Sequence, residues 1–106
     1  MLMGEGALGD VRIMKRETAQ LAMSNLVPQG ARMESFVKGQ GFGAGGRVTI
    51  GPRDTGEGIG TFGWGGAAST IGWVDRTRGI RASGWSQIMT MGDQPFTTGF
   101  GKSVYA

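Results

Sequence analysis

Glycine limits what this chain can fold into more than any other feature, because 22 of its 106 residues are glycine. Average usage is about 7%. Glycine loses more backbone freedom on folding than any other residue, and hydrophobic residues supply only 39% of the chain. Folding therefore requires tight packing of the remaining side chains, or contacts from outside these residues. A chain of this length forms one domain or less.

The chain contains no cysteine and no histidine. The first absence excludes disulfides and thiolate metal sites. The second removes the commonest general base and the commonest metal ligand. Any catalysis must use lysine, tyrosine, serine, aspartate, glutamate or backbone groups, and we expect no cofactor and no metal.

Charge and hydropathy exclude two classes of partner. The net charge of +3 is small and scattered along the chain, unlike the concentrated basic patch of a nucleic-acid-binding protein. No apolar run approaches the length that spans a membrane, and residues 1–5 lack the pattern of a signal peptide. We expect a soluble chain, with the cytoplasm favoured over secretion and the compartment otherwise undetermined.

The residue pattern predicts an α+β fold with a helix on the N-terminal side. In the first segment, residues 1–30, we expect a short strand over 11–14 and a helix over 15–25, where good helix formers dominate. The second segment, residues 31–61, is rich in glycine. Alternating apolar residues predict a strand at 47–50 in this segment, followed by a loop.

An antiparallel meander is predicted for the third segment, residues 62–91. Its apolar stretches are separated by short turns, and Gly79 suits a position with positive φ. The expected strands cover residues 62–67, 69–75 and 80–91. The last segment, residues 92–106, begins as a loop and then starts a helix near Phe100.

Large apolar side chains in the third segment are interpreted as packing residues. They include Trp64, Trp73 and Trp85, together with Ile88 and Met89. A platform on which bases stack would need cations beside the indoles. The nearby arginines instead cluster in or just past the turn at 75–79.

Several polar residues and one motif are interpreted as structural. Residues 41–46 match the letters G-x-G-x-x-G, but a dinucleotide-binding motif needs a helix after it, and here a strand follows. Asp75 and Asp93 are expected in turns without a partner. Three serines without a nearby base are assigned structural roles: Ser69, Ser83 and Ser86.

Two interpretations of residues 62–68 remain open at this level. Glycine weakens a strand unless something must approach its backbone closely. The glycines would then clear a strip along which a substrate could bond to the main chain. The alternative is a barrel corner or a bulge under a packed aromatic ring.

Residues 62–75 read F-G-W-G-G-A-A-S-T-I-G-W-V-D. They resemble the late segment of class C β-lactamase-like serine hydrolases, a superfamily that includes family VIII esterases and penicillin-binding-protein relatives. The family pattern there is close to F-G-W-G-G-A-A-G-T-x-x-W-x-D. Residues 41–45 are similar to its G-F-G-L-G strand, residues 4–23 to a stretch around S-P-E-T, and residues 104–106 to the first turn of its last helix. The resemblance implies that residues 1–106 are the C-terminal part of a β-lactamase/transpeptidase-like fold.

The resemblance also implies a site. The family's third active-site motif, K-T-G, H-G-G or W-G-G, lies on a strand beside the cleft, and Trp64, Gly65 and Gly66 occupy its position. The backbone N–H of Ala67 would then be an oxyanion donor, since a tetrahedral oxyanion needs fixed N–H groups. Trp64 in place of lysine or histidine favours an ester over a β-lactam carboxylate, because that position carries no cation.

This chain departs from the family at the other two active-site motifs, S-x-x-K and Y-x-N. The only tyrosine, Tyr105, is followed by a single residue, and the S-x-x-K lettering of residues 35–38 is interpreted as chance. The resemblance thus implies that serine, lysine and tyrosine come from a preceding segment. The expected function is part of a serine hydrolase that acts on an acyl ester or amide small molecule, inert on its own.

Two other readings remain. One is a non-catalytic glycine-rich β module that binds a ligand or partner, or forms a homo-oligomer, through an exposed sheet edge. The other is a minimal hydrolase in which Ser35 and Lys38 are catalytic.

Overall fold

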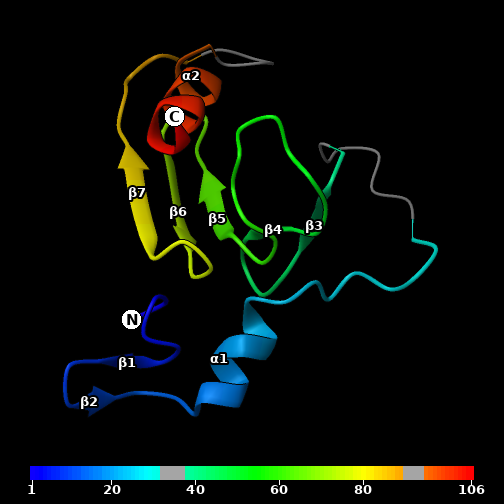
Figure 1. The fold of residues 1–106 in the computed structure, drawn as a ribbon, viewed down its shortest axis with the longest axis vertical. Coiled ribbons are helices and arrows are strands. Elements are labelled where there is room, and N and C mark those ends of the chain that lie inside the picture. The colour runs from blue at the N-terminus through cyan, green and yellow to red at the C-terminus, as the bar shows by residue number, and fades with distance from the viewer. Residues whose placement is uncertain (32–37, 90–94) are drawn as a thin grey trace.

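The computed structural model describes residues 1–31, 38–89 and 95–106, which form a small α+β domain with two antiparallel sheets and two helices. The larger sheet has five strands, and the helices α1 and α2 lie near its opposite ends (Figure 1). The expected α+β class is confirmed.

The five-stranded sheet follows chain order, β3-β4-β5-β6-β7, and each neighbouring pair is antiparallel. The predicted meander is therefore present as its last three strands. Two further strands precede it, of which only the second was predicted from the alternating residues. The strands are β3 (Gln40–Phe42), β4 (Arg47–Thr49), β5 (Phe62–Gly65), β6 (Ile71–Asp75) and β7 (Ile80–Gly84).

The N-terminal segment forms a small ribbon and a helix. β1 (Ala7–Leu8) pairs with β2 (Val11–Arg12), and α1 (Arg16–Ala22) follows. The helix is shorter than the predicted 15–25, and Asn25 lies beyond its end. Its Oδ1 accepts from the backbone N–H of Phe42, at 3.1 Å, which ties the end of the helix to the sheet.

The third strand of the meander is shorter than predicted: β7 ends at Gly84, not at residue 91. A Cβ at Gly84 would lie 3.1 Å from the ring of Phe100, so α2 packs directly on the strand end. The chain then leaves the sheet. The predicted packing role is wrong for Trp85, Ile88 and Met89, whose exposures are 79%, 54% and 73%. Residues 90 and 91 lie outside the described residues.

The C-terminal helix is longer than predicted. Residues 92–94 lie outside the described residues, but α2 (Pro95–Tyr105) begins well before Phe100 and ends, rather than starts, at residues 104–105. Proline is favoured in the first turn of a helix, whereas glycine weakens a helix interior. Packing of Phe100 against Trp73, with ring centroids 5.5 Å apart, compensates for the two glycines in α2.

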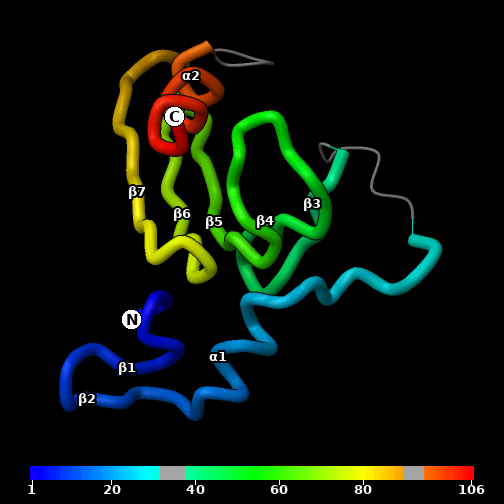
Figure 2. Tube along the Cα trace, in the orientation of Figure 1, coloured from blue at the N-terminus to red at the C-terminus, as the bar shows by residue number. Residues whose placement is uncertain are grey.

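The buried apolar core is small and lies on one face of the sheet. It contains Ala19 and Met23 at and just after α1, and Val48 and Phe62 from the sheet, with Val74 packed against them. Side chains alternate between faces along a strand, so Trp73 lies on the opposite face, where it packs against Phe100 of α2. Figure 2 shows α2 across the upper ends of β5 and β6. Large apolar side chains also remain exposed around the N-terminal ribbon and α1: Leu8, Val11, Ile13 and Leu21.

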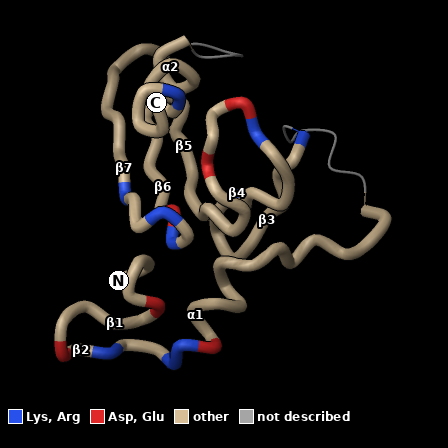
Figure 3. The backbone as a smooth tube through the Cα atoms, in the orientation of Figure 1, with Lys and Arg blue, Asp and Glu red and all other residues tan. Residues whose placement is uncertain are grey.

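Charges of both signs are interspersed on the described residues (Figure 3). Glu5 pairs with Arg76 at 2.9 Å, which joins the N-terminal segment to the turn after β6. Neither helix of the described residues has the length and hydropathy needed to cross a bilayer.

Candidate functional site

The strand that the resemblance identifies, β5, has an open edge over its last residues. β4 pairs with β5 only at Phe62 and Gly63, whereas β6 pairs with the whole strand from Phe62 to Gly65. The N–H groups of an antiparallel strand alternate between its two neighbours. Since the Gly66 N–H donates to Thr70 O on the β6 side, at 2.9 Å, the N–H of Gly65 faces the side that β4 leaves open.

Ala67 lies in the turn that joins β5 to β6. The Ser69 N–H donates to Gly66 O at 3.0 Å, which closes a four-residue turn with Ala67 at its second position. That position does not use its own N–H in the turn. The described residues provide no hydrogen bond to the Ala67 N–H, and the residue is exposed.

The four predicted site residues are thus adjacent and accessible, and the amides of Trp64 and Gly66 are directed to the β6 side. Trp64 is 51% exposed and Gly66 is exposed. The glycines also have an internal reason: a Cβ at Gly66 would collide with the Thr70 hydroxyl, and one at Gly65 would lie 3.0 Å from Thr70 O. The glycines are therefore explained by internal packing and are no evidence of a substrate. The unpaired amides are a separate observation that does not depend on the glycine content.

The opening of this edge is caused by the β3–β4 turn. Continuing the β4–β5 register would place Gly45 opposite Gly65. Gly45 instead adopts φ +85°, which is not a strand conformation. The turn is closed by a hydrogen bond from Gly43 N–H to Gly46 O at 2.8 Å. It is also held against the end of α1 by one from Ala44 N–H to Ala22 O at 2.7 Å.

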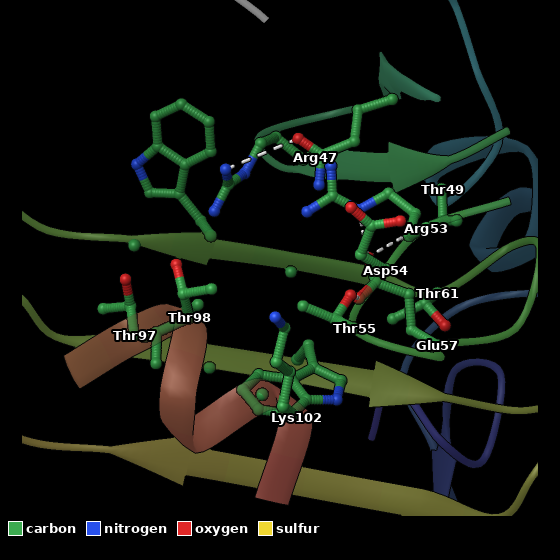
Figure 4. Close-up of a pocket in the computed structure, with 18 of the residues that line it drawn as sticks. Arg47, Thr49, Arg53, Asp54, Thr55, Glu57, Thr61, Thr97, Thr98 and Lys102 are labelled. Atoms are coloured by element: carbon green, nitrogen blue, oxygen red, sulfur yellow. Dashed lines mark hydrogen bonds and ion pairs between the residues drawn. The ribbon is translucent and has the colours of Figure 1, made fainter. Parts of the chain in front are cut away.

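A groove of about 950 Å³ runs along this edge of the sheet. Its walls come from β4, β5, the loop between them and the first turns of α2, so polar side chains from distant segments face one another (Figure 4). Four cations line it: Lys38, Arg47, Arg53 and Lys102. Two carboxylates line it as well, those of Asp54 and Glu57.

Arg47 is the cation closest to the open edge. Its guanidinium carbon lies 5.5 Å from the centroid of the Trp64 ring, a cation–π contact, and its Nη2 is 3.9 Å from where a Gly65 Cβ would be. Burial lowers the pKa of Arg47, and the charge of Arg53 lowers it further. The guanidinium nevertheless keeps its charge. A cation from the neighbouring strand β4 thus lies beside Trp64.

The carboxylate of Glu57 is paired within the loop before β5. It accepts hydrogen bonds from Arg53 Nε at 3.0 Å and Thr49 Oγ1 at 2.9 Å, and from the hydroxyl of Thr55. The pair with Arg53 is mostly buried. Glu57 is therefore engaged by the loop that forms the groove wall.

Asp75 has a different role from the one predicted. It was expected to be an unpaired turn residue, but it is fully buried and accepts five hydrogen bonds. Burial alone would raise its pKa, but hydrogen bonds from Thr77, Gly58, Arg78 and Tyr105 together lower it. The turn bonds follow from the sequence. The bonds from Gly58 and Tyr105 do not, since those residues are 17 and 30 positions away.

Tyr105 connects this carboxylate to the sheet face under α2. The Trp73 Nε1–H donates to its hydroxyl at 2.8 Å, and the hydroxyl donates to Asp75 Oδ2 at 3.1 Å. Burial raises the pKa of Tyr105 to about 12. The only tyrosine of the chain is therefore engaged in fixing α2 on the sheet.

The three serines have the structural contacts that were predicted. Ser69 Oγ donates to Ile88 O at 2.8 Å and Ser86 Oγ to Ala68 O at 2.7 Å, while Trp85 Nε1 donates to Ser83 Oγ at 3.3 Å. Ser35 and Asp93 lie outside the described residues. The described ranges contain no group of three histidine, cysteine, aspartate or glutamate residues that could hold a metal.

Comparisons with known proteins add no further assignment: no family model matches the chain, and no curated protein matches it significantly.

Proposed function

We propose that this chain supplies the oxyanion-side strand of a serine acyl hydrolase with a β-lactamase-like fold, and that it acts on an ester or amide of a small molecule. The observation that carries the proposal is the turn after the open edge of β5, where Ala67 is exposed and its N–H has no partner among the described residues. A developing oxyanion is stabilised by a backbone donor that is fixed in advance, as a closed turn fixes this one.

The nucleophile and its base belong to a segment outside these 106 residues. The chain has no Y-x-N, and Tyr105 is engaged by Trp73 and Asp75. Further polypeptide is also supported by the exposed side chains of Leu8, Val11, Ile13 and Leu21, because exposed apolar residues on neighbouring elements are typical of a surface that another element covers.

The test begins with the coding sequence upstream of Met1. We expect an in-frame S-x-x-K and Y-x-N there, and hydrolysis of a p-nitrophenyl ester by the complete reading frame. The 106-residue chain alone should not turn over the ester. Absence of both motifs upstream would contradict the proposal.

The decisive variant is Ala67→Pro, which removes the N–H. Proline is favoured at the second position of a turn, so the backbone should keep its shape. Loss of an oxyanion donor lowers kcat by about 10²–10³-fold. Ala67→Ser keeps the N–H and should retain activity. Equal activity of both variants would exclude Ala67 as the donor.

A second candidate, a non-catalytic β module that self-associates, is favoured by a separate observation. The sheet order ends at β7, so its outer edge has no strand beside it within the described part of the chain. Open edges pair with other strands. Sedimentation of the purified chain would support this reading if a dimer formed as concentration rises while no ester is hydrolysed. Turnover by the chain alone that is lost in Ser35→Ala would instead favour a minimal hydrolase.

A further inference from the structure

Arg47 has unused capacity to bind an anion. Of its five N–H donors, one is directed to Gln40 Oε1 at a distance of 3.5 Å, which is long for a hydrogen bond. No carboxylate of the described residues forms an ion pair with it. Glu57, the acid whose charge acts on Arg47, is already paired with Arg53.

The side chain is also held in place. Its guanidinium packs on the Trp64 ring, and Trp64 in turn meets Phe42 edge-on, with ring centroids 5.3 Å apart. A guanidinium that is ordered in advance loses less freedom when it binds a ligand. Gly65 leaves the space beside Nη2 open, because a larger residue there would project toward the guanidinium.

The geometry points to a carboxylate-binding subsite at Arg47, which selects acyl substrates that carry a second, anionic group. The inference rests on the proposed function for the position of the reacting carbonyl at Ala67. Arg47 lies beside Gly65, and Ala67 follows Gly65 by two residues, so the guanidinium and the Ala67 amide are neighbours at the end of β5. A ligand that reaches both groups has an acyl carbonyl and a carboxylate joined by a short chain, as in a monoester of succinate or glutarate.

Lys102 strengthens the field in the same groove. Its side chain extends from α2 toward β5 (Figure 4), and it forms no ion pair with the described residues. With Glu57 neutralised by Arg53, the free charge that lines the groove is mainly positive. A groove with charge of one sign concentrates ligands of the opposite sign.

The first experiment measures binding by the 106-residue chain and does not depend on catalysis. Glutarate is titrated into labelled protein, and the indole N–H signal of Trp64, assigned with Trp64→Phe, reports occupancy. We expect saturable binding of glutarate and none of neutral glutaramide. Arg47→Gln should weaken binding about tenfold or more, as for loss of a charge-assisted contact, and Arg47→Lys should restore part of it.

Arg81→Gln is the matched control, because Arg81 is exposed on β7 and does not line the groove. It removes the same charge and should leave glutarate binding unchanged. Equal weakening by Arg81→Gln and Arg47→Gln would show a non-specific charge effect and overturn the subsite. Binding that is unaffected by Arg47→Gln would overturn it as well.

The second experiment separates failure of the subsite from failure of the proposed function. In the complete reading frame, p-nitrophenyl glutarate monoester is compared with p-nitrophenyl valerate. The ratio of their kcat/KM values should favour the anionic ester and fall about tenfold or more in Arg47→Gln. Arg47-dependent glutarate binding without any ester hydrolysis would leave the subsite standing and contradict the hydrolase. Ester hydrolysis whose kcat/KM ratio does not change in Arg47→Gln would support the hydrolase and overturn the subsite.

Discussion

Replacing Asp75 by asparagine should destabilise the fold by about 3 kcal/mol, through loss of charged hydrogen bonds and one orphaned donor. The side chain is fully buried, and both oxygens accept bonds. If asparagine keeps its oxygen at the Oδ1 position, its NH₂ group faces the N–H of Gly58, which now donates to Oδ2 at 2.8 Å. The hydroxyl of Tyr105 can rotate to accept, but the N–H of Gly58 cannot.

A loss of this size is a large part of the stability of a small domain, which is about 5–15 kcal/mol. It corresponds to a fall in melting temperature of about 12–24 °C for a domain near this length. Urea unfolding followed by circular dichroism measures the free energy directly. Asp10→Asn, an exposed aspartate in the turn between β1 and β2, is the control and should change stability by less than about 0.5 kcal/mol.

The pH dependence provides an independent check of the same reasoning. Because the hydrogen bonds lower the pKa of Asp75 in the folded state, its stabilising contribution is complete above its unfolded pKa of about 3.9. It is lost as the pH falls through the folded pKa. The difference between the wild type and Asp75→Asn should therefore be largest near neutral pH and shrink in acid. A variant within about 0.5 kcal/mol of the wild type at pH 7 would refute the reasoning.

Two further predictions concern the sheet and α2. Gly63→Ala should destabilise the fold by about 1–3 kcal/mol, because its Cβ would lie 2.6 Å from the Cβ of Trp73. Gly99→Ala, in an open part of α2, should instead stabilise the fold by about 0.5–1 kcal/mol. Denaturant titration measures the change in the free energy of unfolding for both variants. Changes of the same sign would contradict the packing described here. Ultraviolet titration of Tyr105, the only tyrosine, should give a pKa of about 12. Since that pKa is raised by burial, the contribution of Tyr105 to stability is complete below pH ~10 and declines toward pH ~12, and a titration near pH 10 would contradict its burial.

The meander could be predicted from the sequence because its signals are local. Alternation of apolar residues marks β6, and Gly79, with φ +69°, occupies the turn that follows it, as its lack of a side chain suggested. The same reasoning overextended β7, since residues 85–89 have apolar letters but leave the sheet at Gly84. It also missed most of α2. Gly99 and Gly101 lower the helix propensity of this segment, but packing on the sheet stabilises the helix, and the local sequence does not show that packing.

The candidate site could be predicted only in part. The strip from Trp64 to Ala67 was proposed from one continuous stretch of sequence by its resemblance to a family motif, and the structure shows that Trp64, Gly66 and Ala67 are exposed. Arg47 could not be assigned to it, because its proximity to Gly65 depends on the register between β4 and β5, which no local pattern determines. The bond between Asp75 and Tyr105 was missed for the same reason.

The short hairpin beside β5 makes the site sensitive to changes in chain length. The amide of Gly65 is free because the chain reverses at Gly45 instead of pairing onward. Two residues inserted into this reversal would lengthen each hairpin strand by one residue and supply a partner for the Gly65 amide. Homologous chains with a longer hairpin should therefore have a fully paired β5 and no groove beside it, even if every residue from Trp64 to Ala67 is identical.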